Sequence, residues 1–215
     1  MSAPAPRVPD TPPLAEPSPD YGELAGAFPQ VTKDRMPEVV FRVHRLDREP
    51  EWFTEGVGSR WDPPPASGAT FGTCYVATHP LTALMEVVGD LPVLTSEQVD
   101  DRAMATLMFP DVDRLADMTS PEIARWGLDP RISMGDFYDV SQRWALAPRL
   151  AGYAGVYCEP RHDPGGGASV ALFGDPGYQP TQVRLVSDGP IDRDLIDELF
   201  FRFGVRVMPA RPLLS

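Results

Sequence analysis

Runs of β-branched and aromatic residues alternate with Gly/Pro-rich stretches along most of the chain. The runs at 38–43 (EVVFRV) and 72–78 (GTCYVAT) predict two strands, because short apolar segments bounded by turn residues are typical of strands. The stretch between them, 51–70, is rich in glycine and proline and predicts a long loop of the kind that carries function. Further strands are predicted at 103–109, 154–159, 168–174, 182–187 and 205–209.

Helical signals lie between these strands without a regular alternation. Pro80 suits the first turn of a helix, and Gly89 predicts the end of that helix. Ser141 can cap another helix, which Pro148 interrupts or ends. Helices are predicted over 80–88, 121–126, 141–151 and 191–203. Short strands mixed with isolated helices predict the α+β class, with a mixed β-sheet core and flanking helices.

The first part of the chain differs in composition from the rest. Residues 1–30 are rich in proline, alanine and acidic side chains and show no hydrophobic period, which predicts a disordered, Pro-rich tail. Residues 31–215 are then expected to form one domain, since a chain of 215 residues with 42% hydrophobic content can build one substantial core.

Net charge and terminal sequence narrow the class of partner. The formal net charge is −12, and binding a nucleic acid or an anionic membrane requires a basic face, so neither is expected as a partner. No apolar run is long enough to span a bilayer, and the N-terminus lacks the basic and apolar regions of a signal peptide. These features predict a cytoplasmic protein.

Several common catalytic motifs are absent from the sequence. Cys74 and Cys158 are too few for a disulfide framework and predict buried thiols, and the three histidines have no metal-ligand spacing, so no metal is expected. There is no phosphate-binding P-loop, no dinucleotide fingerprint and no nucleophile elbow. The glycines at 165–167 are interpreted as a hairpin-like connection.

Glu86 is unusual because it lies on the helix predicted over 80–88, where most neighbours are apolar. At about 100° per residue it lies roughly 140° from Leu81, off the apolar stripe. A solvated carboxylate is the simplest interpretation. Arg42, within an apolar strand, raises a second question, because a buried charge needs a partner, which could be a carboxylate of the protein or an external anion.

Four short motifs together carry a family resemblance. FRV at 41–43, GSRWD at 58–62, CYVA at 74–77 and ALME at 83–86 occur in the order found in the RES domain, and the sequence resembles that family over about 40–210. The resemblance implies a fold like that of the ADP-ribosyltransferases. It also implies an enzyme that consumes NAD+ as its substrate, and a bacterial toxin restrained by a cognate antitoxin protein.

By this resemblance, four residues would form the NAD+ site. Arg42 and Arg60 would bind the pyrophosphate with forked, permanently charged donors, Tyr75 would orient the nicotinamide end, and Glu86 would stabilise positive charge on the ribose. Structural alternatives remain for three of them: both arginines as ion-pair partners within the fold, and Tyr75 as a core aromatic.

The family serine marks a departure from the pattern. Its position is assigned here to Glu159, whose carboxylate can accept hydrogen bonds but would repel a pyrophosphate. Glu159 could be a second catalytic carboxylate, could pair with Arg60 and close an empty site, or Ser169 could serve instead after a small loop shift; a solvent-exposed loop carboxylate is the structural alternative. NAD+ glycohydrolase, phosphorylase and ADP-ribosyltransferase activities all stay open, beside a catalytically impaired binding module that senses NAD+ or binds a partner.

Overall fold

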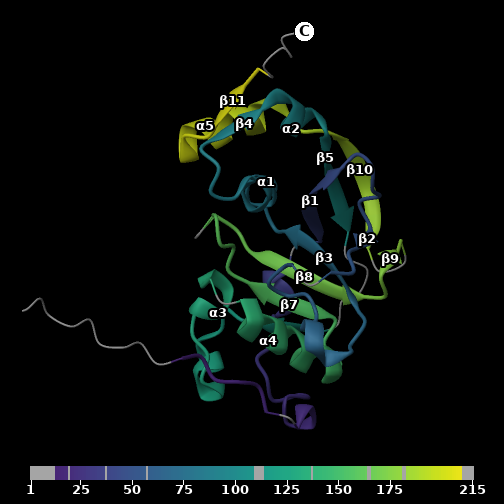
Figure 1. The fold of residues 1–215 in the computed structure, drawn as a ribbon, viewed down its shortest axis with the longest axis vertical. Coiled ribbons are helices and arrows are strands. Elements are labelled where there is room, and N and C mark those ends of the chain that lie inside the picture. Colours follow the sequence, from purple (N-terminus) through teal and green to yellow (C-terminus); the bar gives the residue numbers. More distant parts are fainter. Residues whose placement is uncertain are drawn as a thin grey trace, which may run out of the picture.

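The computed structural model of the chain describes residues 13–209 except 19, 37, 57, 109–113, 137, 164–165 and 181–182. Within this part of the chain, seven strands form a mixed sheet in the order β10-β5-β1-β3-β8-β7-β6. Its strands pair antiparallel except β6 with β7, which are parallel. Helices flank the sheet (Figure 1), so the predicted α+β class with a mixed sheet is confirmed.

The elements have the following bounds. The strands of the large sheet are β1 (Val39–Arg45), β3 (Gly72–Ala77), β5 (Arg102–Met108), β6 (Leu115–Asp117), β7 (Gly155–Cys158), β8 (Ser169–Gly174) and β10 (Arg184–Pro190). Two small sheets pair β4 (Val93–Thr95) with β11 (Arg206–Met208) and β2 (Trp52–Phe53) with β9 (Gly177–Tyr178). The helices are α1 (Pro80–Val88), α2 (Ser96–Asp100), α3 (Arg131–Met134), α4 (Tyr138–Leu150) and α5 (Arg193–Phe203), with 3-10 turns η1 (Tyr21–Glu23), η2 (Lys33–Arg35), η3 (Pro65–Ser67) and η4 (Pro121–Trp126).

Helix α4 differs from its prediction at both ends. It begins at Tyr138, three residues before the predicted cap Ser141, and continues two residues beyond Pro148. The Ser141 hydroxyl donates to the Ile132 carbonyl at 2.8 Å and is buried, so this tertiary contact replaces the local capping contact. The predicted strands at 103–109 and 182–187 include positions 109 and 182, which lie outside the described residues.

The two faces of the sheet are covered differently. On one face, α1 packs against β1 and β3, and α4 packs against β7. On the other face a cluster of buried strand side chains, including Val40, Cys74 and Val170, is covered by Phe53 of β2 and by Val31 and Met36. Helices α1 and α4 therefore lie side by side over the first face of the sheet, and a site can form between them.

Residues 20–30, which belong to the predicted Pro-rich tail, contact the core in the structure. Leu24 and Phe28 are fully buried in the core cluster beneath α4. The Tyr153 hydroxyl donates to the Phe28 carbonyl at 3.0 Å, and the Asp117 amide donates to the Pro29 carbonyl at 2.9 Å. Two buried apolar side chains and backbone hydrogen bonds hold this segment against the core. Residues 1–12 of the predicted tail lie outside the described residues.

Candidate functional site

A cavity of about 340 Å³ lies between α1 and the α3–α4 corner, over the helix-covered face of the sheet. Its volume falls within the range of pockets that bind small ligands. Its wall includes all six residues singled out from the sequence: Arg42, Arg60, Tyr75, Glu86, Glu159 and Ser169. The strand ladders explain why Tyr75 and Ser169 share a face, since Tyr75 pairs with Ala171 and Ser169 pairs with Ala77.

The GSRWD motif forms a turn that carries Arg60 into the cavity. The Asp62 carboxylate accepts a hydrogen bond from the Ser59 amide at 2.8 Å and closes the turn. The buried Trp61 anchors the turn in the core, and its amide donates to the Tyr75 hydroxyl at 2.9 Å. Burial holds the pKa of Tyr75 well above its usual value, so the phenol keeps its proton in the cavity wall.

Arg60 is buried and held mainly by backbone oxygens. Its Nη2 donates to the Gly135 carbonyl at 2.6 Å and its Nη1 donates to the Ile132 carbonyl at 3.3 Å. Its guanidinium also lies 4.6 Å from the centre of the Tyr138 ring, a cation-π contact. Desolvation by burial lowers the pKa of Arg60. This arginine joins the sheet side of the cavity to the α3–α4 corner.

Glu86 faces the cavity from α1, away from the buried positions of that helix. Its Oε1 accepts a hydrogen bond from the His162 amide at 2.8 Å. Solvent reaches the side chain through the open cavity, but the surrounding protein still desolvates the carboxylate and raises its pKa, while the His162 amide and the charge of Arg60 act in the opposite direction.

Two serine hydroxyls in the cavity wall have no protein partner. Ser133 and Ser169 are buried, and neither Oγ makes a hydrogen bond. Buried hydroxyls are usually bonded, so these two point to a polar ligand or water in the cavity. Ser169 lies opposite Cys158 in the β7–β8 ladder and reaches the cavity without any loop shift. Burial raises the pKa of the Cys158 thiol to about 12, so this sulfur stays protonated.

Arg42 contributes to the cavity wall, but its guanidinium lies on the opposite side of the sheet from Tyr75. Phe41 pairs with Ala77 and so shares the face of Tyr75, which turns Arg42 to the other face. There its Nη1 donates to the Pro50 carbonyl at 2.9 Å, to the Trp52 carbonyl at 2.8 Å and to Cys74 Sγ. The partners of Arg42 are therefore backbone carbonyls and a thiol. A carboxylate of the protein or an external anion had been considered from the sequence instead.

Ser133, Tyr138 and Arg161 are among the cavity-wall residues that sequence reasoning missed. Tyr138 lies in GDFYDVSQRWA and Arg161 in PRHDPGGG, both within the span of about 40–210 over which the sequence resembles the RES domain, so their position there was an available signal. Ser133 gave no sequence signal, because only the packing of α3 brings it to the cavity. In the described part of the chain, no group of three or more His, Cys, Asp or Glu side chains could hold a metal ion.

The fold and this cavity define an α+β domain with a polar pocket in which arginine, tyrosine and carboxylate side chains converge. The RES domain model matches residues 39–194, and the chain therefore belongs to the RES domain family. A solved structure with the same fold is a chain of the M. tuberculosis MbcT-MbcA toxin-antitoxin complex, with a TM-score of 0.65 and 19% sequence identity. That match covers 85% of this chain and 97% of the other. No curated protein matches the chain.

Across the described helices, none combines the length and apolar character needed to cross a membrane.

Proposed function

We propose that this protein is an NAD+-cleaving enzyme and the toxin of a bacterial toxin-antitoxin pair. The observation that carries the proposal is the convergence of Arg60, Tyr75, Glu86 and the unbonded Ser169 hydroxyl in the wall of one cavity. Membership in the RES domain family and the fold shared with a chain of a toxin-antitoxin complex support it.

The chemistry of the cavity suits cleavage of the bond between nicotinamide and ribose. When this bond breaks, its electron pair moves to the nicotinamide nitrogen and neutralises the pyridinium, and positive charge develops on the ribose. The Glu86 carboxylate, fixed by the His162 amide, would stabilise that charge. Tyr75 would orient the nicotinamide end, and Ser169 would bind a ribose or phosphate oxygen.

The acceptor of the ADP-ribosyl group is the finer part of the proposal. Water would make the protein a glycohydrolase, inorganic phosphate a phosphorylase, and a protein side chain a transferase. Glu159 also lines the cavity and would act as a second carboxylate that helps to deprotonate a water acceptor. Ser169 supplies a hydroxyl in the same wall, so the cavity contains a serine hydroxyl although Glu159 was assigned to the position of the family serine.

Purified protein incubated with NAD+ tests this proposal directly. Products are separated by chromatography with and without phosphate, and labelled NAD+ reports ADP-ribose attached to macromolecules. We expect Glu86→Gln to lower turnover by roughly 10²- to 10⁴-fold, and Ser169→Ala to lower it by about 10-fold or more. Wild-type protein that leaves NAD+ intact under all these conditions would sink the enzymatic proposal.

A second candidate is a binding module that holds NAD+ without cleaving it. The observation that favours it is a second carboxylate, Glu159, in a cavity that must also accept an anionic dinucleotide. This candidate predicts calorimetric binding of NAD+ with no products. Turnover by the unaltered protein would eliminate it, and activity that appears only in Glu159→Ser would support it.

The toxin part of the proposal has its own test. Induced expression in a bacterial host should arrest growth and deplete NAD+, and Glu86→Gln, expressed at the same level, should do neither. Co-expression of a cognate antitoxin should restore growth and yield a complex that purifies intact. Growth that continues with wild-type protein present in its folded form would refute the toxin assignment.

A further inference from the structure

The segment after β7 is fastened to helix α1 by several contacts. The His162 amide donates to Glu86 Oε1, and the Thr82 hydroxyl donates to the Asp163 carboxylate at 2.6 Å. Asp163 is almost fully buried, and Arg202 of α5 lies 3.7 Å from its other oxygen. These contacts fix the position of the neighbouring Arg161 in the cavity wall.

The two described glycines of this segment make the fastening possible. A Cβ atom at Gly166 would lie 2.0 Å from the Asp163 carboxylate, and one at Gly167 would lie 2.8 Å from the Thr82 hydroxyl. Both positions must lack a side chain for the segment to close on Asp163. Part of the glycine-rich motif therefore has a positional function, and Gly165 lies outside the described residues.

Three arginines line the cavity, and their partners differ in how easily a ligand could replace them. Arg42 donates to backbone carbonyls on the far face of the sheet, and Arg60 donates to buried carbonyls of α3 and its end. Arg161 instead donates from Nη2 to the Asp136 carboxylate at 2.7 Å. Asp136 is 82% exposed, and ion pairs so open to solvent contribute little to stability.

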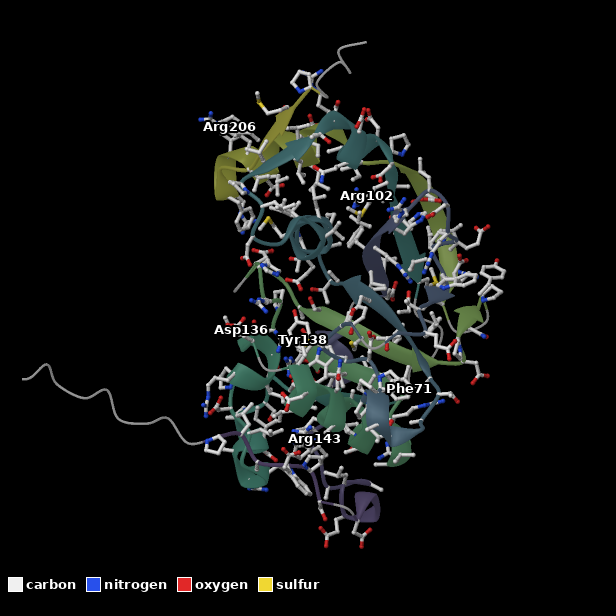
Figure 2. All side chains as sticks on the ribbon, viewed as in Figure 1. Phe71, Arg102, Asp136, Tyr138, Arg143 and Arg206 are labelled. Carbon is white, nitrogen blue, oxygen red and sulfur yellow. The ribbon has the colours of Figure 1, made fainter. Side chains whose placement is uncertain are left out.

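Arg161 also lies close to the other functional groups of the cavity. Its Nη1 donates to the Tyr138 hydroxyl at 3.4 Å. The Arg60 guanidinium lies 4.6 Å from the centre of the same Tyr138 ring. Asp136 and Tyr138 lie together at the α3–α4 corner (Figure 2). The charge of Arg161 adds to desolvation in lowering the pKa of Arg60. Both arginines contact Tyr138, so the two cations lie at one part of the cavity wall.

We propose that Arg161 binds the diphosphate of the substrate, and that the exposed Asp136 carboxylate, which is not part of the cavity wall, holds the Arg161 guanidinium until the diphosphate replaces it. This inference rests on the proposed function for the identity of the dinucleotide. A guanidinium matches phosphate oxygens in a bidentate geometry and forms charge-assisted hydrogen bonds with them. When the diphosphate binds, Arg161 exchanges a weak, solvent-exposed partner, Asp136, for a stronger one. No buried contact of Arg161 is lost.

Calorimetric titration with ADP-ribose tests the inference, because this probe carries the diphosphate but cannot be cleaved at a nicotinamide bond. We expect Arg161→Gln to weaken binding about 10-fold or more, as loss of a charge-assisted contact does. We expect Asp136→Asn to tighten binding several-fold, because the competing carboxylate is gone. The matched control is Arg45→Gln, which breaks the exposed Arg45–Asp47 pair away from the cavity and should bind as wild type does.

Kinetics with NAD+ separates binding from a general structural effect. Arg161→Gln should raise KM while kcat stays within a few-fold of wild type, and hydrolysis of nicotinamide riboside, which lacks the diphosphate, should not respond to the substitution. Arg161→Gln that binds ADP-ribose as tightly as wild type, or wild type that does not bind it, overturns the inference. Binding that depends on Arg161 without any NAD+ cleavage would overturn the proposed activity alone.

Discussion

At the scale of the residue, Glu86 has two opposing roles. The folded protein destabilises its negative charge, and the proposed reaction requires that charge. Desolvation raises its pKa in the folded protein, so ionisation at neutral pH lowers the stability of the fold relative to the unfolded chain. A side chain that supports chemistry at the expense of stability is common at active sites.

Replacement of Glu86 by glutamine should therefore stabilise the protein at neutral pH. The amide oxygen of glutamine can still accept the hydrogen bond from the His162 amide, and the costly charge is removed. The variant should show a higher Tm than wild type at pH values above the raised pKa. The difference should shrink as the pH falls through the folded and then the unfolded pKa, because wild-type Glu86 then becomes neutral as well. Thermal unfolding across this pH range measures the effect, and a Tm difference that is independent of pH would contradict it.

Arg42 should act on folding more than on substrate binding. Arg42→Met leaves the carbonyls of Pro50 and Trp52 without their donor, which should lower the free energy of unfolding by about 1–3 kcal/mol. Urea denaturation measures this loss, and the KM for NAD+ of the folded variant should stay within about twofold of wild type. A large rise in KM with unchanged stability would return Arg42 to the binding site.

At the scale of the element, the segment from Glu159 to Gly167 links a strand of the sheet to the cavity through its contacts with α1. Short apolar runs bounded by turn residues make β3 and β8 predictable from sequence, and Pro80 in the first turn makes α1 predictable. The contacts of Asp163 with Thr82 and Arg202 join positions far apart in the chain, so no local pattern could reveal them.

Gly166→Ala should disturb this segment without disturbing the sheet. Its Cβ atom would overlap the Asp163 carboxylate, so the segment must move and the His162 amide should lose its alignment with Glu86. We expect NAD+ turnover to fall about 10-fold or more while far-UV circular dichroism is unchanged. Gly189→Ala is the matched control, because a Cβ atom there meets nothing within 4 Å. Equal activity of the two variants would show that the segment does not position the site.

At the scale of the whole molecule, the segment around η1 belongs to the core that supports α4. Leu24→Ala removes a fully buried side chain and should lower the free energy of unfolding by about 2–5 kcal/mol, as measured by urea denaturation. Leu46→Ala is the control, since that side chain is 64% exposed and should change stability by less than about 0.5 kcal/mol. Similar stability of both variants would mean that the segment is only loosely attached.

The α+β class, most strands and helices α1 and α5 followed from the sequence pattern. The other features depended on tertiary contacts. Residues 20–30 show no hydrophobic period, so the sequence pattern does not reveal that Leu24 and Phe28 pack in the core. Alternation relates the faces of residues within one strand, but only the pairing of Phe41 with Ala77 shows that Arg42 and Tyr75 lie on opposite faces of the sheet. The positions of Arg161 and Ser133 in the cavity wall depend on the packing of the segments around them, so the sequence pattern alone could not predict these positions.

The hydrogen bond between Tyr153 and the Phe28 carbonyl joins residues 125 positions apart, and this separation has a consequence for protein synthesis. At about 5–20 residues per second, a ribosome needs roughly 6–25 s to produce Tyr153 after Phe28. During that interval the segment around Phe28 has left the ribosome without its partner, and the strand that supplies Ser169 has not yet been made. A nascent chain therefore has no complete cavity until Ser169 has been synthesised, so the protein becomes competent for its proposed reaction only after that point.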